Sequence, residues 1–308
     1  MPCYNGMPFV EGAFRGLLEQ DYENMEIVLS DDCSSDESLE VAEELAGNYS
    51  GPHRVRIFRN EKRLGMGNYN RLVELAEHDF IVMAHADDLP DPSRVSLLVD
   101  AWMESGATLI ASNAMVASAE NQDMHLLWVN ETSPDPTPEA VARKGRIDTG
   151  LLAATFAWHR DLFDRFGAID PDKSPVISDW ILPFRANLLN GIVYLNKPLV
   201  RFRRHAGTRW SRFFVDRGHP DREREYGLAN FIVQRRYMQE TLEQFLDANP
   251  EAAPRFVHLR KILADALAQD LSDWISSRNR LMNEGLRPAW TDSDSKGSCG
   301  AAGRGAAG

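Results

Sequence analysis

Two adjacent carboxylates, Asp87 and Asp88, stand just beyond the apolar run 80–84, after His85 and Ala86. Such a run is typical of a strand in a parallel sheet with both faces covered, and ligands gather outside the carboxyl ends of these strands. Carboxylates at that position can hold Mg²⁺ or Mn²⁺ together with the oxygens of a bound diphosphate. The alternative is an ordinary loop, in which Asp88 precedes a turn at 89–92. The spacing alone leaves both interpretations open.

Three more carboxylates stand at the ends of expected elements. Asp31 and Asp32 follow the expected strand 26–30, and Asp179 begins the segment 179–185. If the strands are parallel neighbours, the two aspartate pairs converge at one rim and form an acidic crevice suited to a metal-bound nucleotide. Taken alone, Asp31 and Asp32 also fit a turn before a helix. Asp179 also fits an N-cap that satisfies free backbone N–H groups.

A histidine, His205, follows the basic stretch 201–204. A cationic loop can contact phosphates, and a neutral imidazole can bind a metal ion. The same residues fit a basic surface cluster that carries one histidine. The residues by themselves leave both interpretations open.

Apolar periodicity predicts alternating helices and strands in the first part of the chain. Val10, Phe14 and Leu17 recur on one helical face, and Ser34 with Glu37 forms a capping-box pattern that opens a second helix. Strands are expected at 26–30, 55–58, 80–84 and 107–111, and helices at 8–19, from 34 onward, at 68–77 and at 93–104. This alternation predicts an α/β fold with a mostly parallel central sheet flanked by helices.

The second half of the chain is less regular. Short strands are expected at 124–129, 192–195 and 199–203, in a mixed sheet, and a helical appendage is expected over 222–284 with a break at Asn249-Pro250. The predicted boundaries are a catalytic domain at 1–215, the helical appendage at 216–290 and a disordered tail at 291–308, because that tail has little apolar surface to bury.

The start of the sequence lacks the apolar run with which an α/β sheet normally begins. Met1 is followed at once by Pro2-Cys3-Tyr4-Asn5. We therefore expect the first strand to be missing, with the natural start codon upstream of Met1 and a hole in the core where the strand would lie.

Composition narrows the class of protein. The chain has 308 residues, 43% of them hydrophobic, and a formal charge of -12, which argues against nucleic-acid binding because phosphate contacts need a basic surface. No apolar stretch is long enough to cross a bilayer, and no signal peptide is visible. We expect a cytoplasmic protein with reduced, structural cysteines, possible peripheral contact with the inner membrane face and an oligomeric state that the sequence does not define.

A series of short motifs follows along residues 2–210. They are Pro2-x-Tyr4-Asn5, Leu18-x-Gln20-x-Tyr22-x-Asn24-x-Glu26, Asp31-Asp32-x-Ser34-x-Asp36, Asn60-x-x-x-Leu64-Gly65, Ala86-Asp87-Asp88, Ser178-Asp179 and Arg203-Arg204-His205-x-Gly207. In order and spacing the series resembles family 2 of the inverting glycosyltransferases, and together the motifs are far more specific than any one of them. The resemblance implies the nucleotide-sugar-binding fold named GT-A.

The resemblance also implies roles for the residues that would bind the nucleotide. Tyr4 and Asn5 would border the base, and Asp31 or Asp32 would hydrogen-bond uracil or ribose. These residues would belong to the donor site of a nucleotide sugar, most simply a uridine diphosphate sugar.

Asp87 and Asp88 would hold a Mn²⁺ or Mg²⁺ ion that bridges the two phosphates and neutralises the charge on the leaving nucleoside diphosphate. Arg63 would add a cation to those phosphates. His205 falls where the resemblance places a mobile segment that closes on the donor. Where relatives often carry an aspartate two positions before the metal-binding one, this chain has His85, which either ligates the metal itself or leaves a weaker site.

Asp179 resembles the catalytic base, which takes the proton from an acceptor hydroxyl as that hydroxyl attacks the anomeric carbon. A single displacement inverts the configuration. The implied activity is transfer of a sugar from a nucleotide donor to a hydroxyl of a glycan or a lipid-linked saccharide. The alternatives are a nucleotidyltransferase, whose Gly-rich triphosphate loop is not visible, and a noncatalytic or truncated nucleotide-sugar-binding protein.

Overall fold

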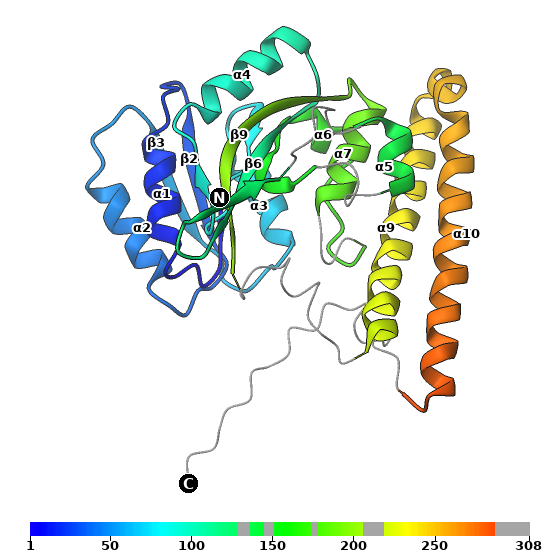
Figure 1. The fold of residues 1–308 in the computed structure, drawn as a ribbon. Helices are drawn as coiled ribbons and strands as arrows, with labels where there is room; N and C mark the ends of the chain where they lie inside the picture. Colours follow the sequence, from blue (N-terminus) through cyan, green and yellow to red (C-terminus); the bar gives the residue numbers. More distant parts are fainter. Residues whose placement is uncertain (128–135, 145–150, 174–177, 206–218, 287–308) are drawn as a thin grey trace.

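The computed structural model describes residues 1–127, 136–144, 151–173, 178–205 and 219–286. They form an α/β arrangement of two sheets with helices, and a pair of long helices packs along one side (Figure 1). The expected fold class, with a C-terminal helical appendage, is confirmed. The expected tail at 291–308 lies outside the described residues, and the domain boundaries stay a prediction.

The first sheet is wholly parallel, in the order β1-β2-β3. Its strands are β1 (Pro2–Cys3), β2 (Glu26–Asp31) and β3 (Arg54–Arg59). Helices α1 (Val10–Leu18) and α2 (Ser38–Gly47) lie beside it (Figure 1). The apolar face expected for the first helix is buried in one cluster with the inward side chains of β2. This burial fixes the position of β2 along the sheet, and with it the place where β2 ends.

The second sheet is mixed, in the order β4-β8-β6-β9-β5, and β7 pairs with β6. Its strands are β4 (Phe80–Val82), β5 (Leu89–Pro90), β6 (Leu109–Ser118), β7 (Asp123–Leu126), β8 (Ala157–His159) and β9 (Ile192–Arg204). Within it the β6–β9 pair is parallel and the other pairs are antiparallel. The expected strands 192–195 and 199–203 are one continuous strand, β9, which crosses register shifts opposite Asn113.

Other described helices are α3 (Gly67–Leu75), α4 (Arg94–Ser105), α5 (Pro138–Lys144), α6 (Asp161–Asp164) and α7 (Ser178–Leu188), with a 3₁₀ turn at Ala153–Thr155. Of these, α3 packs on the first sheet, α4 packs on the second, and α5 packs on other helices; several of them carry residues of the site. The largest buried cluster joins Phe156, Trp158 and Phe184 to Met238 and Leu259 of the C-terminal helices. This shared core fixes the long helices to the sheet.

The two long helices are α9 (Pro220–Ala248) and α10 (Ala253–Asn283), separated by a 3₁₀ turn at Pro250–Ala252, where the sequence predicted a break. Arg235 of α9 forms a buried ion pair with Asp270 of α10 and donates to the carbonyl of Arg143 (2.8 Å). Among the described helices, none combines the length and the apolar character that crossing a membrane requires.

One local expectation, the capping box at Ser34, is wrong. Ser34 does not cap the second helix: α2 begins at Ser38, and Asp36 instead accepts a hydrogen bond from the Ser38 amide (3.1 Å). The hydroxyl of Ser34 accepts a hydrogen bond from the backbone N–H of Asn5 (2.9 Å), so it fixes the loop after β2 to the loop after β1. The start of the chain forms the two-residue β1 beside β2, and the expectation of a missing first strand stays a prediction.

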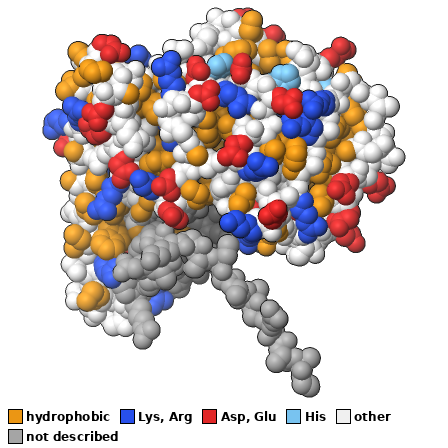
Figure 2. Space-filling view, turned by 180° about the vertical axis from the view of Figure 1, so that it is seen from behind, with side chains coloured by type: hydrophobic (Ala, Val, Ile, Leu, Met, Phe, Trp, Pro, Cys, Tyr) orange, Lys and Arg blue, Asp and Glu red, His pale blue; other side chains and the backbone are white. Residues whose placement is uncertain are grey.

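Acidic and basic side chains alternate over the face drawn in Figure 2, with apolar side chains between them. The negative charge of -12 is therefore not gathered into one patch on that face. Positive charge near the acidic loops comes from individual arginine and histidine side chains, which are described below with the candidate site.

Candidate active site

Three candidate metal ligands meet in the loop after β4. His85, Asp87 and Asp88 each offer a ligand atom, and these atoms lie within 4.8 Å of one another. The short strand β4 ends at Val82, two residues before the end of the expected strand 80–84, and the chain then leaves the sheet. The structure therefore brings the two carboxylates of the sequence prediction together with His85.

Asp88 is the buried member of this cluster, with 3% of its surface exposed. Its Oδ1 accepts a hydrogen bond from the backbone N–H of Arg203 (3.0 Å), whereas Oδ2 has no hydrogen-bond donor in the described part of the chain and lies 3.5 Å from His85 Nδ1. Burial raises the pKa of Asp88, and the neighbouring Asp87 charge raises it further. A buried carboxylate oxygen without a donor fits a hard cation, because Mg²⁺ and Mn²⁺ prefer oxygen ligands.

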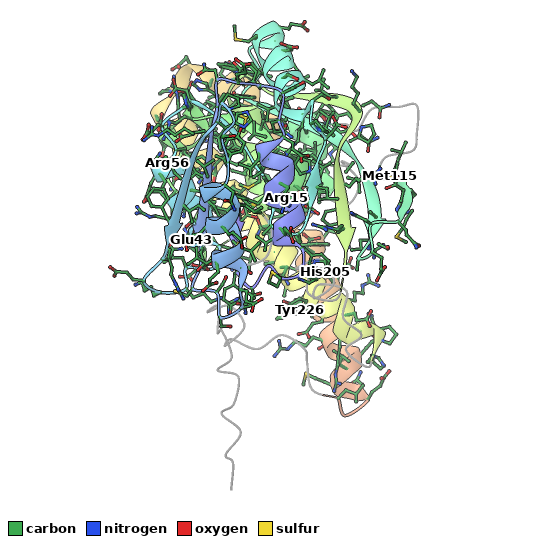
Figure 3. The ribbon with its side chains drawn as sticks, turned by 90° about the vertical axis from the view of Figure 1, so that its left-hand side faces the viewer. Arg15, Glu43, Arg56, Met115, His205 and Tyr226 are labelled. Carbon is green, nitrogen blue, oxygen red and sulfur yellow. The ribbon has the colours of Figure 1, made fainter. Side chains whose placement is uncertain are left out.

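Asp87 is partly exposed and is paired with His205. The ring nitrogen Nε2 of His205 donates to Asp87 Oδ2 (3.2 Å), and the His205 ring packs against Phe9 with 4.3 Å between the ring centroids. Burial raises the pKa of Asp87, but the hydrogen bond from His205 and the charges of His85 and His205 outweigh it and leave the pKa below its usual value. His205 lies at the end of β9 (Figure 3).

Arg203 ties the end of β9 to this loop. Besides the backbone contact with Asp88, its guanidinium donates to the carbonyl oxygens of Asp87 and Phe9, the latter at 3.1 Å, and lies 4.8 Å from the centre of the Phe9 ring. The residue is buried, and burial lowers the pKa of its guanidinium. Arg203 therefore positions the Asp87–Asp88 loop and places a cation beside it.

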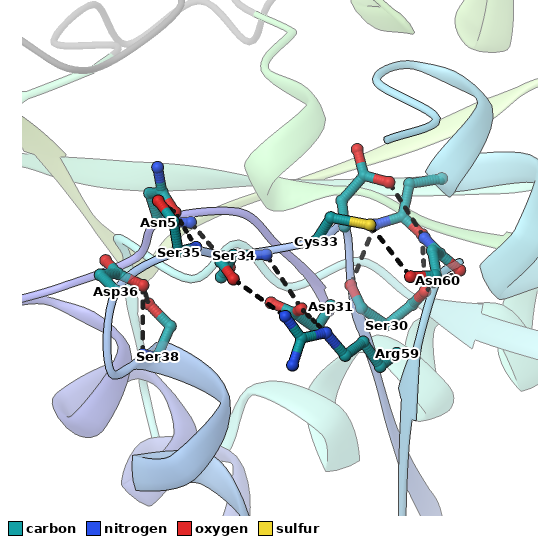
Figure 4. Close-up of polar contacts among 12 residues, drawn as sticks. Asn5, Ser30, Asp31, Cys33, Ser34, Ser35, Asp36, Ser38, Arg59 and Asn60 are labelled. Atoms are coloured by element: carbon teal, nitrogen blue, oxygen red, sulfur yellow. Dashed lines mark hydrogen bonds and ion pairs between the residues drawn. The ribbon is translucent and has the colours of Figure 1, made fainter. Parts of the chain in front are cut away.

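Asp31 is completely buried at the end of β2. Oδ2 accepts from the Ser34 amide (3.0 Å) and lies 3.8 Å from Nε of Arg59 (Figure 4). Oδ1 has no hydrogen-bond partner among the described residues. Asp31 Oδ1 therefore has unused acceptor capacity, and the nucleotide contact that the resemblance implies for Asp31 or Asp32 stays a prediction.

Asp32 has its oxygens committed to the protein. Oδ1 accepts from the side chain of Asn60 (3.0 Å) and from the Leu64 amide (2.7 Å), and Oδ2 accepts from the Gly65 amide (2.8 Å). Gly65 adopts a positive φ of 59°, which suits glycine at this tight turn. The geometry assigns Asp32 the task of shaping the 60–65 loop.

The 60–65 loop carries Arg63 to the expected base-binding residues. The guanidinium of Arg63 lies 3.7 Å from the centre of the Tyr4 ring, and Tyr4 is 39% exposed. Asn5, at a positive φ of 48°, accepts from the Ser35 amide through its Oδ1 (2.8 Å; Figure 4). Tyr4 and Arg63 thus present an exposed stacked pair, whereas Asn5 holds two loops together.

Helix α3 links the ends of β2 and β4. Asn68 accepts from the Ser30 hydroxyl (2.6 Å) and donates to the Ser30 carbonyl (2.9 Å). The next residue, Tyr69, is hydrogen-bonded through its hydroxyl to His85 Nε2 (2.9 Å). The two acidic loops are therefore held to adjacent residues of one helix. The parallel pairing that the sequence prediction assumed is absent from the described sheets, because β2 and β4 belong to different sheets, and a shared binding site for the two loops stays a prediction.

Asp179 lies at the second position of α7, where the sequence allowed an N-cap or a catalytic base. Its side chain lies outside the described residues, so its role stays a prediction. The backbone of Asp179 is helical, within the first turn of α7.

The sequence patterns did not indicate that Asn68, Tyr69 and Arg94 belong to the site. Arg94 is buried on α4, and its guanidinium donates a hydrogen bond to the Ala154 carbonyl (2.9 Å). Burial lowers the pKa of this guanidinium to about 10, although the charge of Asp88 acts in the opposite direction. An arginine on the otherwise apolar buried face of a helix was the available signal. Asn68 and Tyr69 gave no comparable signal, because polar and aromatic residues are common on helices.

The family model described as glycosyl transferase family 2 matches residues 1–167, which is more than half of the chain. The chain belongs to this family. The match ends after β8, so it covers both acidic loops and β1 to β8 but excludes α7, β9 and the long helices.

Relatives of this family 2 member agree with the assignment. The dTDP-rhamnosyl transferase RfbG of Shigella flexneri is 28% identical over 120 residues, which are 37% of this chain and 41% of RfbG. The chain thus spans less than half the length of this curated relative. S. aureus TarS 1-349, solved with UDP-GlcNAc, has a TM-score of 0.56 at 17% identity and covers 92% of this chain and 90% of that chain.

A second solved structure is the mannosyltransferase PcManGT from Pyrobaculum calidifontis, in complex with GDP-Man and Mn²⁺. It has a TM-score of 0.53 at 17% identity over 94% of this chain and 75% of that chain. At these identities the similarity shows the fold. The α/β core of the family 2 member is the GT-A fold, as the resemblance implied.

Proposed function

We propose that this family 2 member is an inverting glycosyltransferase that moves a sugar from a nucleoside-diphosphate donor, a UDP-sugar, to a hydroxyl of a glycan or a lipid-linked saccharide. The observation that carries the proposal is the buried Asp88 carboxylate, whose Oδ2 has no donor among the described residues, beside Asp87 and His85. The arrangement lies at the rim that also holds Asp31. A divalent cation, bound together with the donor diphosphate, would supply a partner for Asp88 Oδ2.

The donor would be bound by residues from both acidic loops. Asp87 and Asp88 would hold Mn²⁺ or Mg²⁺, which when bound neutralises charge on the leaving diphosphate. Asp31 would accept a hydrogen bond from the base or ribose through its open Oδ1, and the Tyr4–Arg63 pair would cover the nucleotide. TarS is solved with UDP-GlcNAc and PcManGT with GDP-Man and Mn²⁺, which supports a nucleotide donor with a divalent cation and leaves the base as part of the proposal.

The acceptor half of the reaction is assigned to Asp179. As the base, it would take the proton from the acceptor hydroxyl while that oxygen attacks the anomeric carbon and the bond to the diphosphate breaks. One displacement without a covalent sugar intermediate inverts the configuration. Peripheral contact with the inner membrane face and a cytoplasmic location would suit a lipid-linked acceptor.

The test is the Asp179→Asn variant, with Asp172→Asn as a control because Asp172 is an exposed carboxylate on the segment before α7. We expect Asp179→Asn to keep its affinity for UDP and UDP-sugars in calorimetry, since the proposed role of Asp179 concerns the acceptor hydroxyl and not the diphosphate. We expect it to lose at least 100-fold in UDP release with acceptor present, within the usual contribution of a general base. Equal transfer by wild type and Asp179→Asn would remove the base assignment, and UDP-sugar binding without any turnover by wild type would favour the noncatalytic alternative.

A further inference from the structure

The segment that follows Asp88 forms the last strand of the second sheet. Strand β5 contains only Leu89 and Pro90, and within the described residues it pairs with β9 alone. The next residue extends this contact, because the Asp91 amide donates to the Leu199 carbonyl (2.9 Å). A strand of two residues that includes proline makes few ladder hydrogen bonds, so its pairing with β9 holds the segment only weakly.

The end of α1 packs against the same segment. A Cβ atom at Gly16 would stand 2.9 Å from Pro90 Cδ, so any larger residue at Gly16 would push the helix and the strand apart. Just after α1, the Asp21 amide donates to the Pro92 carbonyl (3.0 Å), and the Asp21 carboxylate accepts from the Ser96 hydroxyl (3.0 Å). The segment is therefore held by β9 and by the end of α1.

Gln20 joins these parts of the chain through its side-chain amide, and only 5% of the residue is exposed. Its Nε2 donates to the Gly16 carbonyl (2.9 Å) in the last turn of α1 and to the Asp91 carbonyl (2.8 Å). Its Oε1 accepts from the Val95 amide (3.1 Å) in the first turn of α4. Helix ends leave such carbonyl and N–H groups without intrahelical partners. One buried amide thus satisfies a group of each helix and a carbonyl of the loop between β5 and α4.

Asp88 is attached to β9 at the other end of the segment. Its Oδ1 accepts from the Arg203 amide (3.0 Å), and its Oδ2 has no donor among the described residues. Asp91, whose carbonyl Gln20 holds, stands only three positions further along the chain. A shift of 89–91 along β9 would therefore move Asp88 Oδ1 away from the Arg203 amide and turn Oδ2 with it.

We propose that Gln20 is a positioning residue for the donor cation: its amide fixes 89–91 against α1 and α4, keeps Asp88 on the Arg203 amide and leaves Oδ2 available to the ion. The role toward the cation rests on the proposed function, whereas the position of Asp88 depends on the hydrogen bonds alone. A carboxylate that is held in place before the ion binds loses less conformational freedom on binding. Groups that orient metal ligands typically contribute about 10- to 100-fold to metal affinity.

The experiment compares Gln20→Met with Arg160→Met in the full chain. Methionine has about the length of glutamine but makes none of the three hydrogen bonds of Gln20. Arg160 is the matched control, because it also donates to a carbonyl in the last turn of a helix, that of Val73 (3.1 Å), and to the His78 carbonyl (3.2 Å). These carbonyls precede β4, whereas Asp88 follows it.

Two measurements separate positioning from overall stability. Calorimetry with Mn²⁺ in the presence of UDP measures cation affinity, and hydrogen exchange at the Arg203 amide, without ligand, reports whether Asp88 still accepts from it. We expect Gln20→Met to weaken Mn²⁺ binding about 10- to 100-fold and to speed exchange at the Arg203 amide about tenfold. Arg160→Met should change neither quantity, although both variants should unfold at a lower urea concentration than wild type.

Unchanged Mn²⁺ affinity in Gln20→Met would overturn the inference, and so would equal losses of Mn²⁺ affinity in Gln20→Met and Arg160→Met. If Gln20→Met does not fold, Gln20→Glu keeps the acceptor for the Val95 amide, loses both donated hydrogen bonds and is judged by the same two measurements. If wild type binds no Mn²⁺ while exchange at the Arg203 amide is still faster in Gln20→Met, the positioning of Asp88 by Gln20 stands and the proposed function is contradicted.

Discussion

Asp32 and Asp31 are neighbours in sequence, but the structure predicts opposite consequences for the same substitution. In the wild type, the Gly65 amide donates a hydrogen bond to Asp32 Oδ2 (2.8 Å). Asp32→Asn keeps one carbonyl oxygen for Asn60 and Leu64, but it turns an NH₂ group toward the Gly65 amide, so this hydrogen bond is lost. Losing one hydrogen bond to a charged group costs about 1.5–3 kcal/mol. The free energy of unfolding should fall by that amount.

Asp31→Asn should leave stability nearly unchanged. The new carbonyl still accepts from the Ser34 amide, and the NH₂ group takes the position of Oδ1, which has no partner in the described structure. The lost ion pair with Arg59 spans 3.8 Å and its arginine is 55% exposed, so it contributes less than about 1 kcal/mol. Affinity for UDP should nevertheless fall at least tenfold, because under the proposed function Asp31 Oδ1 accepts a hydrogen bond from the nucleotide.

Urea unfolding followed by tryptophan fluorescence measures the first effect, and calorimetry with UDP and Mn²⁺ measures the second. With a urea m-value of about 2 kcal/mol/M, Asp32→Asn should shift the midpoint by roughly 1 M, and Asp31→Asn by less than half of that. The reasoning is refuted if the two variants unfold at the same urea concentration, or if Asp31→Asn is the less stable one. If Asp32→Asn lost affinity for UDP and Asp31→Asn did not, the nucleotide contact would have to be assigned to Asp32.

Two further predictions concern the cation and the pH dependence of stability. A ligand that binds the native state raises the melting temperature, and Asp88→Asn should abolish the Mn²⁺-dependent part of this rise with UDP. Asp100→Asn removes an exposed carboxylate on α4 and should keep the rise. An unchanged rise in Asp88→Asn would place the cation elsewhere. Burial raises the pKa of Glu26, but the Glu77 amide (2.5 Å) and Arg56 (2.9 Å) outweigh it and leave the pKa below its ordinary 4.5. The Glu26 charge therefore stabilises the fold above about pH 4.5 and loses this effect as pH falls through the lowered pKa. Between about pH 5 and pH 3, the stability difference between wild type and Glu26→Gln should shrink, whereas the exposed Glu23→Gln control should show a small, pH-independent difference.

Local periodicity was enough to predict most elements of the first part of the chain. The helix expected at 8–19 is α1 (Val10–Leu18), and the strand expected at 26–30 is β2 (Glu26–Asp31). Side-chain burial on one face fixes these elements, and burial leaves a period in the sequence. The expected capping box failed because Ser34 has a long-range partner, Asn5, which outweighs the local pattern.

The candidate site divides in the same way. The sequence identified Asp31, Asp87 and Asp88 because carboxylates at strand ends have a recognisable position. It did not separate Asp31 from Asp32, because their roles depend on which oxygens the 60–65 loop occupies. Arg94 and Tyr69 escaped prediction because their partners come from loops far away along the chain.

The amino-acid sequence by itself determined the α/β class, the acidic strand ends and the resemblance that the family match bears out. Those features depend on residue type, period and order, which are properties of a chain read in one dimension. Only the tertiary structure decided that Asn68 and Tyr69 of α3 hold the two acidic loops together and that Arg203 fixes the Asp87–Asp88 loop. These outcomes depend on which polar groups meet after burial, and a buried group without a partner becomes visible only when its neighbours are in place.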